Sequence, residues 1–161
     1  DMSRAEAFKL STGFYVMVQA FAIPGAVLIN FFIDKVDRVM ALAISMFIAA
    51  CGYLYLGFID DIFSKQMYFG AALLGLGEIF ANISAISLIG SAAPAKGRGA
   101  VIGGFSFFGA IGILLVASIG GYLFDNVGPT APFTMVGFAN LALLILALLL
   151  LFLERRKKIQ I

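Results

Sequence analysis

Five long apolar runs, separated by short polar loops, account for most of the 161-residue chain. They cover residues 10–33, 39–59, 67–93, 99–124 and 132–153. Because a helix rises about 1.5 Å per residue, about 20 apolar residues cross the hydrocarbon of a bilayer. Every run reaches that length. The pattern therefore predicts an all-α integral membrane protein with five transmembrane helices.

The composition agrees with a membrane location and excludes several classes of function. Hydrophobic residues make up 62% of the chain and charged residues 12%, against about 25% charged in soluble proteins. With no histidine and one cysteine, Cys51, the chain offers no internal disulfide and no cluster for zinc, haem or a catalytic triad. We therefore expect no enzyme activity, no cofactor, no metal and no nucleic-acid partner.

The basic residues are sorted by loop. Eight of them lie at one set of run ends and three at the other. The eight are Lys35, Arg38, Lys96, Arg98, Arg155, Arg156, Lys157 and Lys158, and the three are Arg4, Lys9 and Lys65. The positive-inside rule places the larger group in the cytoplasm. We therefore expect a multi-pass protein of the cell's inner membrane, with the carboxyl terminus cytoplasmic and the amino end of this chain outside.

One carboxylate, Glu78, lies near the middle of the run 67–93. An ionised side chain at that depth costs about 2.5 to 3.5 kcal/mol on insertion scales, so it usually faces a cavity or a partner. Steps of three and four residues put small and polar residues on its side of the helix and large apolar residues on the opposite side. The small side also holds Ala71, Gly75, Asn82 and Ala85. Glu78 is thus either a functional group or a protonated side chain that hydrogen-bonds a neighbouring helix.

Other residues within the runs carry weaker signals. Gln19, in the first run, is a second polar candidate of the same kind as Asn82. Tyr53 lies near the end of the second run and is typical of the membrane–water interface. In the fourth run, small residues four apart indicate close contact between helices. These pairs are Gly99 with Gly103 and Ala117 with Gly121.

The loop after the first run resembles the signature of the major facilitator superfamily, G-x-x-x-D-[RK]-x-G-R-[RK]. Asp34, Lys35 and Arg38 match it, while Asn30 and Asp37 stand where the signature has glycines.

A second stretch is similar to the loop and helix pair near the end of many members of that superfamily. It consists of PAKGRG at residues 94–99, the glycine-rich fourth run, and DNVGPTAPF at residues 125–133. In that superfamily the signature loop, the loop matching residues 94–99 and the carboxyl terminus are all cytoplasmic, as the charge pattern independently places them here.

The resemblance implies that the five runs are helices eight to twelve of a twelve-helix solute transporter, most of one six-helix half. The chain begins at Asp1 rather than Met, and we expect it to be a carboxyl-terminal part whose missing amino-terminal half is a partner. In such transporters two halves enclose a cavity near the bilayer midplane and give alternating access to it. The third run would line that cavity.

Residue roles follow from this placement. Glu78 suits proton coupling, because desolvation disfavours its charged form. Asn82 and Gln19 supply amides that bind a small solute. Asp34 and Arg98, with the neighbouring loop residues Lys35 and Arg38, are expected to act in cytoplasmic gating. The alternative for Asp34 is a local pair with Lys35 or Arg38, worth under about 1 kcal/mol when exposed.

The leading hypothesis is therefore a secondary-active, proton-coupled solute transporter that works by alternating access. The alternative is a non-transporting membrane scaffold, in which Glu78 and Asn82 bind a neighbouring helix.

Overall fold

The computed structural model describes residues 4–33, 35–59 and 65–159, and the regular structure in these residues is helical throughout. Its elements are α1 (Arg4–Ile33), α2 (Arg38–Gly57), α3 (Gln66–Ala92), α4 (Arg98–Asn126) and α5 (Ala131–Ile159). Each contains a stretch long and apolar enough to cross a membrane, the shortest being the 20 residues of α2. The prediction of an all-α membrane protein with five spans is confirmed.

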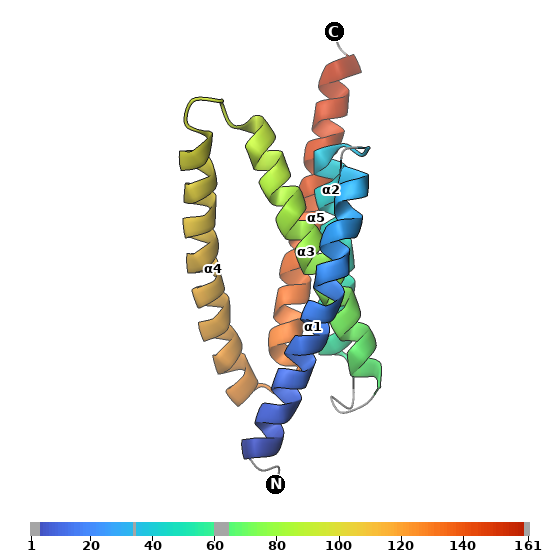
Figure 1. Ribbon diagram of the computed structural model, residues 1–161, viewed down its shortest axis with the longest axis vertical. Coiled ribbons are helices and arrows are strands. Elements are labelled where there is room, and N and C mark those ends of the chain that lie inside the picture. The colour runs from blue at the N-terminus through green and yellow to red at the C-terminus, as the bar shows by residue number, and fades with distance from the viewer. Residues whose placement is uncertain (1–3, 34, 60–64, 160–161) are drawn as a thin grey trace.

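Four helices, α1, α2, α3 and α5, form one bundle, and α4 stands apart from it along most of its length (Figure 1). Within the bundle α2 packs against both α3 and α5, and α1 packs against α3. Where α4 turns into α5, Gly120 lies close to Pro132. The first residues of α1 and the last residues of α5 lie at opposite ends of the molecule, as an odd number of spans requires (Figure 1).

Polar and special residues mark the helix ends. Asp37 caps α2, since its Oδ1 accepts hydrogen bonds from the amides of Val39 and Met40 at 3.0 and 3.2 Å. Helix α3 ends before Pro94, which favours the extended backbone seen at Ala93. Gly97, at the start of α4, has a φ of 107°, a value that residues with a side chain rarely adopt.

The backbones of α2 and α3 meet closely because two glycines leave room. A Cβ added at Gly52 would lie 2.8 Å from the backbone nitrogen of Leu74. A Cβ added at Gly77 would lie 2.5 Å from the Cα of Ala49. Neither position therefore has space for a side chain, and this close approach is typical of small residues in membrane helices.

A buried hydrogen bond between two serines reinforces this contact. Ser45 and Ser84 are both fully buried, and their Oγ atoms lie 3.3 Å apart. Ser45 Oγ also donates to the carbonyl oxygen of Ala41, at 2.7 Å. Because a hydroxyl has one hydrogen to donate, Ser84 is the donor in the bond between the helices.

Three glycines of the fourth run, α4, were expected to contact another helix closely, and the described part of the chain shows no such contact. No other described segment places an atom within 4 Å of a Cβ added at Gly99, Gly103 or Gly121. The physical reason is the position of α4, which stands away from the bundle between its two ends (Figure 1). The glycines that bring helices together lie in the bundle instead, in α1, α2, α3 and α5.

Candidate functional site

The carboxylate of Glu78 lies halfway along α3 and contacts a side chain from α2. The hydroxyl of Tyr53 donates a hydrogen bond to Glu78 Oε1. Every other charged side chain that the structure describes lies in a loop or at a helix end. Tyr53 is therefore the polar partner that the described part of the chain gives to its mid-membrane carboxylate.

Beside Glu78 lies a pocket of about 190 Å³ between α1 and α3. Its polar lining consists of Gln19 from α1 together with Glu78 and Asn82 from α3. The rest of the wall is formed by Val18, Ala22, Gly75 and Ile79. The structure thus brings together the three residues that the sequence singled out for solute or proton binding.

Two more glycines position α1 at this pocket. Gly75 faces the carbonyl oxygen of Val18 so closely that no side chain fits between them. Further along, a Cβ added at Gly25 would lie 2.8 Å from the Leu76 side chain. Because Gln19 directly follows Val18, these contacts bring its amide to the pocket of α3.

The pocket combines two kinds of polar chemistry. The amides of Gln19 and Asn82 each donate and accept hydrogen bonds, whereas the carboxylate of Glu78 accepts them and can also take up a proton. All three side chains are exposed in this chain, so the pocket is open on one side. This arrangement suits a polar solute, a proton, or the polar face of another helix.

Tyr53 is the site residue that the sequence did not identify. Its side chain is half-buried and packs on the core formed by Val18, Leu56, Ala71 and Leu74. Its position near a run end was consistent with the membrane–water interface but did not show which way the helix is turned. The one available signal was the carboxylate itself, since an intramembrane acid needs a donor nearby.

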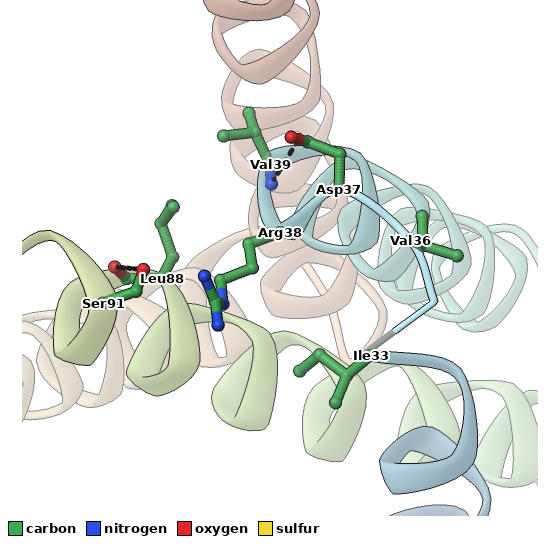
Figure 2. A pocket seen from close by; sticks show the side chains of 7 residues that line it. All are labelled: Ile33, Val36, Asp37, Arg38, Val39, Leu88 and Ser91. Atoms are coloured by element: carbon green, nitrogen blue, oxygen red, sulfur yellow. Dashed lines mark hydrogen bonds between the residues drawn. The ribbon is translucent and has the colours of Figure 1, made fainter.

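Three of the predicted gating residues, Lys35, Arg38 and Arg98, lie at the end of the molecule where α5 ends. Arg38 Nε donates to Ser87 Oγ at 3.3 Å and so links the start of α2 to the last turns of α3. Together with Asp37 and Ser91, Arg38 lines an open pocket of about 370 Å³. Figure 2 shows the Arg38 side chain reaching from α2 towards the helix that carries Ser91.

Two other predicted loop residues, Lys35 and Arg98, do not take part in the contact between Arg38 and Ser87. Lys35 is exposed in the turn before α2, and Arg98 is exposed at the first residue of α4. Asp34 lies outside the described residues. The gating role of all four loop residues remains a prediction.

Comparison with known proteins shows similarity along almost the entire chain. Residues 3–161 match the Major Facilitator Superfamily. The magnetosome protein MamH of Paramagnetospirillum magneticum (strain AMB-1) is 36% identical over 125 residues, which are 78% of this chain and 29% of MamH. MamZ, a magnetosome protein of the same organism, is 30% identical over 120 residues, 74% of this chain and 19% of MamZ.

MamZ of Magnetospirillum gryphiswaldense is 29% identical over 120 residues, 74% of this chain and 18% of that protein. The chain thus spans less than a third of the length of each of these relatives. No solved structure matches it.

Proposed function

Because the chain belongs to the Major Facilitator Superfamily, we propose that it is the carboxyl-terminal part of a secondary-active solute transporter. In this proposal α1 to α5 are helices eight to twelve of a twelve-helix protein. The amino-terminal half supplies the other wall of a central cavity, and the two halves rock to open that cavity to each side in turn.

The observation that carries the proposal is the convergence of Gln19, Glu78 and Asn82 on one pocket at mid-height in apolar helices. Polar side chains are costly at that depth, and they are usually found facing a cavity or a transport pathway. Two of the three lie on α3 and the third on α1, so the pocket depends on how these helices pack.

Glu78 serves as the proton carrier in this mechanism. In its charged form the carboxylate is held by polar donors, and protonation removes the charge before the cavity changes sides. Solute binding by the amides of Gln19 and Asn82 then favours one protonation state over the other, which couples the two fluxes. The solute is a small polar molecule with groups that pair with an amide.

In this proposal the cytoplasmic loops control the opening of the cavity. The hydrogen bond from Arg38 to Ser87 holds the α1–α2 turn against the end of α3, and its rupture would let that end open. Lys35 and Arg98, both exposed, would pair with the amino-terminal half in the closed state. Asp34 belongs to the same set by its place in the signature.

A non-transporting scaffold is the second candidate, and the contact between Tyr53 and Glu78 favours it. A carboxyl group that only joins two helices needs no cavity. The names of the relatives are compatible with either function, and they suggest the magnetosome membrane as an alternative to the inner membrane at large. Fractionation of a cell that expresses the tagged full-length protein distinguishes the two membranes.

The test of the proposed function is uptake by the full-length protein reconstituted in vesicles. With an imposed pH gradient, some members of a panel of labelled polar metabolites should accumulate above their external concentration. A protonophore should abolish that accumulation. Absence of uptake and exchange for the whole panel, by a protein shown to be folded, would favour the scaffold.

A further inference from the structure

We propose that Tyr53 is a positioning residue that controls the protonation of Glu78. The inference rests on the proposed function, in which Glu78 is the group that exchanges protons. It adds a residue from a third helix, because Tyr53 belongs to α2 whereas the pocket is formed by α1 and α3.

The packing of α2 on α3 fixes the hydroxyl of Tyr53 at the carboxylate. Tyr53 directly follows Gly52, and Glu78 directly follows Gly77, the two glycines at which the backbones of these helices meet. The buried pair of Ser45 and Ser84 holds the same register further along. This register of α2 on α3 therefore places the donor beside Glu78.

Among the described side chains, Tyr53 is the titratable group in contact with Glu78. Helix α1 contributes the neutral Gln19, and the part of α1 whose side chains the structure describes, Thr12 to Ile33, has no charged side chain. On α3, the neighbour in the pocket is the neutral Asn82. The other titratable side chains that the structure describes on these three helices are Tyr15, Arg38, Cys51, Tyr55 and Tyr68, and none of them lines the pocket beside Glu78.

The hydrogen bond from Tyr53 should favour the charged form of Glu78 over the protonated form. A phenol that donates to a carboxylate stabilises the charged form, because a hydrogen bond to an ionised group is roughly twice as strong as one between neutral groups. When Glu78 takes up one proton from the aqueous phase, its charge is lost and Tyr53 keeps its own proton. The new carboxyl O–H then needs an acceptor, and the amide oxygens of the pocket provide one.

The test is a pH titration of Glu78 in the full-length protein, followed by infrared absorption of its protonated carboxyl group. The band is assigned by its loss in Glu78→Gln. In Tyr53→Phe the ring remains and the donor is gone, so the midpoint should move to higher pH by about one unit, a tenfold change in the protonation equilibrium. An unchanged midpoint would overturn the proposal.

Tyr55→Phe is the matched control, because Tyr55 lies on the same helix and packs edge-on against Phe69. Its midpoint should equal that of the wild type, and a shift as large as that of Tyr53→Phe would contradict a specific role. A second variant places 3-fluorotyrosine at position 53, whose more acidic hydroxyl should move the midpoint to lower pH. A move to higher pH would contradict the donor role.

The same preparations separate this inference from the proposed function. If Tyr53→Phe moves the titration but no solute is driven by a pH gradient, Tyr53 controls Glu78 and the transport proposal fails. If uptake is driven by protons and Tyr53→Phe changes neither the titration nor the pH profile of uptake, the transport proposal stands and the role of Tyr53 is refuted.

Discussion

Apart from the bond from Arg38 to Ser87 at one end, three hydroxyl groups carry the polar contacts between α2 and α3 in the described residues, those of Ser45, Tyr53 and Ser84. In an apolar medium an unpaired polar group is costly, so each such bond favours the packing that satisfies it over packings that do not. Two of the groups bond to each other and the third bonds to Glu78. Single side chains therefore select the register that brings Tyr53 to the carboxylate.

Removal of the Ser84 hydroxyl should weaken this pairing. In Ser84→Ala, Ser45 keeps its bond to Ala41 but the bond between the helices is lost. We expect the free energy of unfolding to fall by about 0.6 kcal/mol, the average for hydrogen bonds between membrane helices, and by no more than about 1.7 kcal/mol. This free energy is measured by unfolding the full-length wild type and variant in detergent.

Ser118→Ala is the control for this prediction. Ser118 is exposed on α4 and donates to Leu114 within its own helix, so its removal should leave the unfolding free energy nearly unchanged. Equal losses in the two variants would show that the contact between Ser45 and Ser84 adds nothing specific.

At the scale of the element, α2 and α3 act as one unit because their backbones touch at Gly52 and Gly77. In Gly77→Ala the added methyl group would meet the backbone of Ala49, and overpacking of this kind costs about 1 to 3 kcal/mol. The variant should lose thermal stability. It should also alter the titration of Glu78, because Glu78 follows Gly77 directly.

Gly90→Ala, in the same helix, is the comparison, since nothing lies within 4 Å of a Cβ added there. Alanine is the better helix former by about 1 kcal/mol, so this variant should be as stable as the wild type or more so. If both alanines destabilise the protein alike, close approach of α2 and α3 is not the reason.

The sequence predicted helices better than it predicted their contacts. Apolar runs bounded by Asp37, Pro94 and Gly97 show where helices begin and end, because the caps and breakers act locally. Contacts between helices depend on which faces meet, and several helices carry suitable glycines. Close packing was expected in the fourth run but is found at Gly52 and Gly77.

At the candidate site, too, local features could be predicted from the sequence and contacts between helices could not. The helical period placed Glu78 and Asn82 on one face from the sequence alone, since they are one turn apart. That Gln19 would join them depends on the packing of α1 at Gly75, and that Tyr53 would contact Glu78 depends on the packing of α2. Neither contact has a local signature.

At the scale of the molecule, the five helices separate two polar ends. The α1–α2 and α3–α4 connections lie at the end that holds the carboxyl terminus, and the α4–α5 connection lies at the other (Figure 1). The basic residues follow this division, with eight at the first end and three at the second. On the positive-inside rule we therefore propose that the first end faces the cytoplasm.

This orientation can be measured in a Cys51→Ala background of the full-length protein. A cysteine at Lys65 should react with a membrane-impermeant thiol reagent added outside intact cells. A cysteine at Lys96 should react only after permeabilisation. The reverse pattern would invert the orientation and with it the assignment of the gating loops to the cytoplasm.

The central claim, that Glu78 couples solute movement to protons, is tested most directly by Glu78→Gln in vesicles containing the full-length protein. Glutamine keeps the size and hydrogen-bonding capacity of the side chain but cannot exchange a proton at physiological pH. With an imposed pH gradient, uphill accumulation of solute should be abolished, while exchange down the solute gradient survives. Undiminished uphill transport with an intact pH dependence would contradict the claim and leave Glu78 as a structural link between α2 and α3.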